Sequence, residues 1–239
     1  MSDASHALAD AGRAYRGLDV VTIATAGGRK VGGELARPSA KGPALLLLHE
    51  WWGLDPQTKA FATEFAELGY LSLTCDLYGG RSTSDYDQAS ALMEGLDLAA
   101  VDDILVSWAG WLRRHPLGNE KLATIGWCMG GRFSVSCSVA TPVDATVVYY
   151  GRVNHSATEL ANLKGPVLGH FAEKDPWYNH ATVDPFETTM KRLGKSLELY
   201  WYDADHAFAG PTSETYDEGA AQLAWERTLK FLSANLRAT

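Results

Sequence analysis

The fold is decided by Thr124-Ile125-Gly126-Trp127-Cys128-Met129-Gly130-Gly131-Arg132-Phe133, in which an apolar strand runs through Gly-x-Cys-x-Gly directly into a helix. A nucleophile placed between two glycines at a strand-to-helix corner is typical of a nucleophile elbow, here with cysteine in place of serine. Gly126 and Gly130 lack a Cβ and let neighbouring backbone come close. We therefore expect Cys128 at a helix N-terminus, where the helix dipole favours its thiolate and the Met129 N–H faces a developing oxyanion.

The segments around this elbow alternate between strand and helix patterns. A predicted hairpin over 19–36 leads to a continuous apolar run that predicts a strand buried on both faces. The further strands are expected at 70–75, 121–127, 145–150, 166–171 and 196–202, and helices at 129–139, 156–163 and 184–193, with an amphipathic helix near the C-terminus. This order predicts an α/β fold with a mostly parallel central sheet and helices on both faces. Residues 1–17 are expected to form an N-terminal arm, and residues 18–239 a single domain.

Chain order supplies two partners for the cysteine. An elbow nucleophile is followed first by an acid and then by a histidine, each after a later strand. Asp175 follows the predicted strand at 166–171, and His206 follows the one at 196–202. We expect Asp175 to orient His206, with Glu173, Asp203 and Asp205 as rival carboxylates.

The loop after the first buried strand reads His49-Glu50-Trp51-Trp52-Gly53. It begins like a zinc-protease motif, but Gly53 stands where H-E-x-x-H requires the second histidine, so no metal site is expected. Neither G-x-G-x-x-G nor a G-K-[ST] phosphate loop is found, so we expect no cofactor. From the position of this loop, we expect it to supply the second N–H group that binds the oxyanion, and we expect that group to be the N–H of Trp51.

The charge and composition of the chain limit the kinds of molecule with which it is expected to interact. The 239 residues carry a formal net charge of −8 with no basic run, which argues against a nucleic-acid partner. No apolar run is long enough for a membrane span, and no export signal is recognised. With three cysteines, an odd number, a cytoplasmic protein with reduced thiols is expected, as a monomer or small homo-oligomer.

Taken together, these motifs resemble the dienelactone hydrolase family of the α/β-hydrolase superfamily. The resemblance is carried by segments 49–53, 76–81, 126–131 and 149–151, by Asp175 and by segment 205–208. It implies a Cys128–His206–Asp175 triad. It also implies that Glu50 takes the thiol proton once substrate displaces it from an arginine, and that Arg81, which matches that arginine, binds the substrate carboxylate.

One position departs from the family pattern. Members that act on dienelactones carry a second arginine shortly after the catalytic histidine, and the corresponding position here is Gly210. The expected substrate is therefore a small ester or lactone, cleaved through a thioester intermediate, without strict dienelactone specificity. Two alternatives stay open: a thiol-dependent lyase or transferase acting on a small carbonyl compound, and a non-catalytic member that binds a small ligand.

Overall fold

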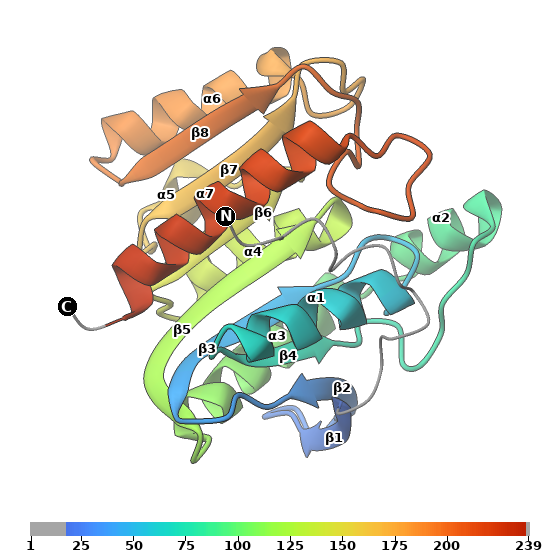
Figure 1. The fold of residues 1–239 in the computed structure, drawn as a ribbon, viewed down its shortest axis with the longest axis vertical. Helices are drawn as coiled ribbons and strands as arrows, with labels where there is room; N and C mark the ends of the chain where they lie inside the picture. Colours follow the sequence, from blue (N-terminus) through green and yellow to red (C-terminus); the bar gives the residue numbers. More distant parts are fainter. Residues whose placement is uncertain (1–17, 238–239) are drawn as a thin grey trace, which may run out of the picture.

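A single eight-stranded sheet forms the centre of the computed structural model, which describes residues 18–237 (Figure 1). The predicted N-terminal arm at 1–17 lies outside these residues. The strand order is β1-β2-β4-β3-β5-β6-β7-β8, with β1, β2 and β4 paired antiparallel and every other neighbouring pair parallel. The strands span Leu18–Ala24 (β1), Lys30–Ala36 (β2), Gly42–Leu48 (β3), Leu71–Cys75 (β4), Gly118–Trp127 (β5), Ala145–Tyr149 (β6), Val167–Ala172 (β7) and Leu197–Tyr202 (β8).

Helices cover both faces of the sheet, as the alternation of patterns predicts. One face is covered by α1 and α7, and the other by α3, α4, α5 and α6. Within the described residues the helices are Pro56–Glu67 (α1), Tyr86–Glu94 (α2), Leu98–Arg114 (α3), Met129–Ala140 (α4), Ala157–Leu160 (α5), His180–Arg192 (α6) and Glu218–Leu236 (α7). No helix among residues 18–237 combines the length and the apolar character needed to cross a membrane.

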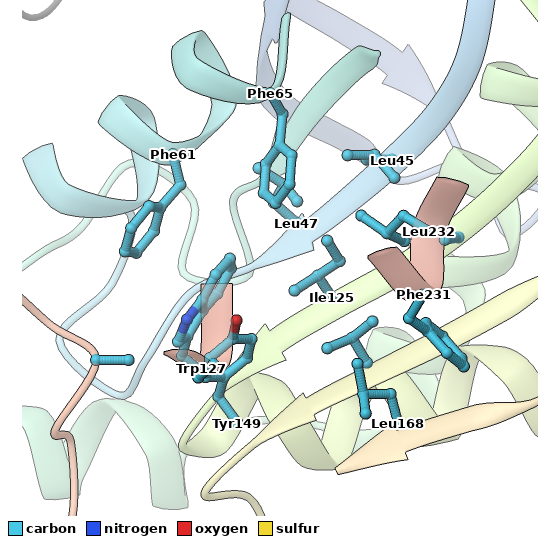
Figure 2. Packing of buried hydrophobic residues seen from close by; sticks show 14 of the residues in the cluster. Leu45, Leu47, Phe61, Phe65, Ile125, Trp127, Tyr149, Leu168, Phe231 and Leu232 are labelled. Carbon is cyan, nitrogen blue, oxygen red and sulfur yellow. The ribbon is translucent and has the colours of Figure 1, made fainter. Parts of the chain in front are cut away.

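Burial on both faces explains the continuous apolar run of β3. Successive side chains of a strand point to opposite faces. Leu45 and Leu47 accordingly pack in the core beneath α1 and α7, whereas Leu46 and Leu48 pack beneath α3 and α4. Figure 2 shows the first of these cores, with aromatic rings of α1 above the labelled strand residues. The sheet is thereby fixed in register, and its carboxyl edge is held at a defined place.

Two helices differ from the expected bounds. The predicted helix at 184–193 begins earlier, at His180, and contains Pro185. The additional first turn is marked by the His180 ring, which bonds the Asp184 carboxylate four residues on. The helix predicted over 156–163 is a single turn, α5, whose start is fixed by a reciprocal capping box between Ser156 and Glu159.

Candidate active site

Cys128 lies at a strained corner between β5 and α4. Its φ is +52°, a conformation that side chains other than glycine rarely adopt, and α4 begins at the next residue. A Cβ at Gly126 would overlap the Gly130 carbonyl, and one at Gly130 would overlap the Leu48 carbonyl at the end of β3. The glycines therefore allow three backbone segments to meet, and the sulfur is presented at the carboxyl edge of the sheet.

His206 and Asp175 form a close pair at the same edge. His206 Nδ1 lies 2.6 Å from Asp175 Oδ2, and the other carboxylate oxygen accepts the N–H groups of Trp177 and Tyr178 at 2.8 and 3.0 Å. Burial alone would raise the pKa of Asp175, but the hydrogen bond and charge of His206, with these N–H groups, hold that pKa below its usual value. The ionised carboxylate keeps the proton on Nδ1 and leaves Nε2 of His206 able to accept one.

Aromatic rings enclose the His206 imidazole. The ring centroids of Tyr150, Trp177 and Tyr178 lie 5.1, 5.0 and 5.6 Å from it. Trp177 is 61 % exposed, so it forms an outer wall of the site. Trp127, although it directly precedes Cys128, lies in the core, stacked between Phe61 and Tyr149 (Figure 2).

The sulfur of Cys128 faces backbone donors. The N–H groups of Met129 and Trp51, the two donors predicted for an oxyanion, interact with the sulfur and lower its pKa. Burial and the nearby Glu50 carboxyl act more strongly in the opposite direction, so the pKa of Cys128 is raised. The backbone donors at the helix N-terminus thus favour the thiolate, as expected, but burial outweighs them. Within residues 18–237, no hydrogen bond joins the sulfur to His206.

Glu50 is a buried carboxyl next to the sulfur. Burial, and to a lesser extent the charge of Asp55, raise its pKa to about 8, against a smaller lowering by the Tyr150 hydroxyl. Its Oε1 atom and the Tyr150 hydroxyl are both buried without a hydrogen bond of ordinary geometry. The backbone at Glu50 is held by His49, whose Nδ1 lies 2.5 Å from the Glu50 carbonyl and whose Nε2 accepts the Leu77 N–H. The sequence indicates His49 only as part of an incomplete metal motif, and no pattern in it points to this positioning contact.

Arg81 lies at the rim of the site and is exposed. Its Nε donates to the Tyr78 carbonyl at 3.1 Å, and the Tyr78 hydroxyl contacts the Met129 sulfur. Among the described residues, no ion pair joins Arg81 to Glu50. The arginine partner that the resemblance implies for Glu50 is therefore not found in this state.

Gln57 occupies the space beside Gly210. Its Oε1 accepts the N–H and the hydroxyl of Thr212 at 3.2 and 2.8 Å, and a Cβ at Gly210 would lie 2.9 Å from its Nε2. A larger side chain at position 210 would have to displace this amide. No sequence pattern indicates this contact, since 155 residues separate Gln57 from Thr212.

The other histidines are placed away from this cluster. His170 is buried and bonded to Tyr202 and Thr228, and burial lowers its pKa to about 3. His155 contacts Ser136, and His180 bridges two exposed carboxylates. No group of three or more potential metal ligands is found within residues 18–237.

The comparisons of this chain with known proteins indicate one family. The model of the family described as "Dienelactone hydrolase family" matches residues 31–236. The chain is 30 % identical to the protein usf of Aquifex pyrophilus, over 87 % of this chain and 95 % of that protein. It is 25 % identical to carboxymethylenebutenolidase 1 of Cupriavidus pinatubonensis, over 90 % and 96 %. A solved dienelactone hydrolase-like promiscuous phosphotriesterase, P91, from metagenomic libraries shares the fold, with a TM-score of 0.83 at 21 % identity over 92 % of this chain and all of that one.

Proposed function

Because the chain belongs to the dienelactone hydrolase family, a family of ester and lactone hydrolases, we propose that it cleaves a small ester or lactone with Cys128 as nucleophile and a thioester as intermediate. One observation carries the proposal: a cysteine at a strained elbow shares its sheet edge with the His206–Asp175 pair and with two backbone donors, from Trp51 and Met129. This arrangement suits acyl transfer, which needs a nucleophile, a proton carrier and oxyanion donors.

The resting site keeps its nucleophile neutral. A thiol with a raised pKa resists oxidation and attacks slowly, so a base must act when substrate is present. Glu50, beside the sulfur, serves as this base in its ionised form. Thiol proton transfer to Glu50 yields the thiolate, which turns away from the Trp51 and Met129 N–H groups and attacks the carbonyl carbon. The carbonyl oxygen then takes the place of sulfur at these donors.

Three proton transfers complete the reaction. The tetrahedral intermediate collapses to the thioester, and the leaving alkoxide takes the proton from Glu50. His206 Nε2 next removes a proton from water, and the resulting hydroxide attacks the thioester. The departing thiolate recovers that proton from His206, while Asp175 stabilises the imidazolium between these events. The carboxylic acid and the alcohol are released.

The nucleophile is tested by trapping the intermediate. With a 4-nitrophenyl ester, rapid acid quench and intact-protein mass spectrometry, wild type is expected to gain the acyl mass and Cys128→Ala to gain none. Cys137→Ala is the matched control, because Cys137 is a free, buried cysteine in α4, the helix that Cys128 precedes. Equal turnover by wild type and Cys128→Ala would refute the assignment, as would acylation of the Cys128→Ala protein.

A further inference from the structure

The loop that carries His206 runs from the end of β8 to the start of α7. Residues 206–216 contain no helix or strand, and Ala207, directly after the histidine, has a φ of +64°. A residue other than glycine rarely adopts this left-handed conformation, which persists only where surrounding contacts hold the backbone. The place of the His206 ring therefore depends on how this loop is fixed.

Hydrogen bonds within the loop join its successive turns. The Gly210 N–H donates to the Ala207 carbonyl at 3.1 Å, and the Ser213 N–H donates to the Gly210 carbonyl at 2.8 Å. The Thr215 hydroxyl then donates to the His206 carbonyl at 2.5 Å. These contacts make the segment one hydrogen-bonded unit, so a contact at its middle also constrains the histidine.

Gln57 makes such a contact from the first turn of α1. Its Oε1 accepts both the N–H and the hydroxyl of Thr212, at 3.2 and 2.8 Å, and Gln57 is only 8 % exposed. Within residues 18–237, the other side-chain hydrogen bond between this loop and a distant part of the chain joins His206 to Asp175. The loop is thus held at two places, and Gln57 supplies one of them.

The helix that carries Gln57 is itself firmly placed. The loop at 49–53, which holds the proposed base and an oxyanion donor, leads into it, and the Asp55 carboxylate caps it by accepting the Thr58 N–H at 2.9 Å. Farther along the helix, Phe61 packs in the core on the sheet. Gln57 therefore projects from a rigid element, as a residue that supports a catalytic loop must.

We infer that Gln57 is a positioning residue: by holding Thr212, it fixes the loop that presents His206 for hydrolysis of the thioester. The inference rests on the proposed function and adds a residue to it. In that function Glu50 serves the formation of the thioester, whereas His206 serves its hydrolysis. Loss of the Gln57 contact should therefore slow deacylation selectively, because a small misplacement of a proton acceptor lowers a rate strongly.

Gln57→Met keeps the length of the side chain and removes its acceptor. With 4-nitrophenyl butyrate, kcat/KM reports acylation, and kcat divided by the fraction of protein that carries the acyl mass at saturation gives the deacylation rate constant. We expect the deacylation rate constant to fall about tenfold or more and kcat/KM to change less than about twofold. The acylated fraction, measured by rapid acid quench and intact-protein mass spectrometry, should rise.

Two substitutions at Thr212 test the same contact from its other side, and they apply even if Gln57→Met does not fold. Thr212 is exposed, so the fold should tolerate both. Thr212→Val removes the hydroxyl and should slow deacylation, though less than Gln57→Met, because the backbone N–H still bonds Gln57. Thr212→Ser keeps both donors and should retain the wild-type rate. Equal deacylation rates in these two variants would contradict the inference.

Gln222→Met is the matched control, because Gln222 is an exposed glutamine of α7 whose amide bonds the Glu226 carboxylate. It should alter neither step. Equal slowing of acylation and deacylation by Gln57→Met would give Gln57 a merely structural role and overturn the inference, as would an unchanged deacylation rate constant. Unchanged butyrate turnover by Cys128→Ala would instead overturn the proposed function, so the two failures are distinguishable.

Discussion

Glu50 and Tyr150 bring two buried polar atoms together without a hydrogen bond of ordinary geometry. Buried polar groups are nearly always paired, so an orphaned pair beside a nucleophile marks a place where the fold tolerates an unfavourable arrangement. The Tyr150 hydroxyl still lowers the pKa of Glu50, against the larger effect of burial. The fraction of Glu50 that is ionised near neutral pH therefore depends on the Tyr150 hydroxyl as well as on burial.

Tyr150→Phe tests this coupling. Removing the hydroxyl should raise the pKa of Glu50 above its value of about 8 in wild type. If ionised Glu50 is the base, kcat/KM rises with pH through that pKa, and the midpoint of the variant moves to higher pH. The measurement is a pH–rate profile for the acylation step of both proteins. A midpoint that stays in place or moves to lower pH contradicts the coupling.

At the scale of elements, the elbow joins β5 to α4 at a point where β3 also ends. Gly126 faces the Gly130 carbonyl so closely that no side chain fits between them. Gly126→Ala should therefore destabilise the fold severely, by more than about 3 kcal/mol, because the Gly130 carbonyl belongs to the backbone and cannot move aside. Gly32→Ala is the control, since a Cβ at Gly32 in β2 would meet no atom within 4 Å. Chemical denaturation measures both, and similar stabilities would contradict this account of the elbow.

The helices and strands could largely be predicted from the sequence, whereas the active site could be predicted only in part. Helical patterns and continuous apolar runs identify helices and buried strands because burial imposes them, as the all-buried β3 shows. Chain order likewise pointed to His206 and Asp175, which the structure brings to 2.6 Å. The protonation state of Cys128 was not predictable, because it follows from three-dimensional burial. Nor were the contacts of Gln57, which depend on residues distant in the chain.

At the scale of the whole molecule, Glu50 links activity to stability. An unfolded glutamate has a pKa near 4.5, and burial raises it to about 8 in the folded chain. Between pH 4.5 and about pH 8, Glu50 therefore keeps its proton in the folded state and loses it in the unfolded state. This contribution to stability is complete below pH 4.5 and is lost as pH rises through about 8, by an amount on the order of a few kcal/mol.

Glu50→Gln removes this ionisation and keeps nearly the same shape. The variant should unfold at a Tm close to that of wild type at pH 4, where the carboxyl is neutral in the folded protein and mostly neutral in the unfolded chain. At pH 8.5 it should be more stable than wild type, because wild type must then either ionise a buried carboxyl or hold its proton against solvent. If Glu50 is the base, the activity of the variant should be lower than that of wild type at both pH values. Thermal unfolding monitored by circular dichroism across this range measures the difference. A stability gap that is independent of pH would show that the carboxyl ionises as freely in the folded chain as in water, and the physical basis for its proposed part in catalysis would be lost.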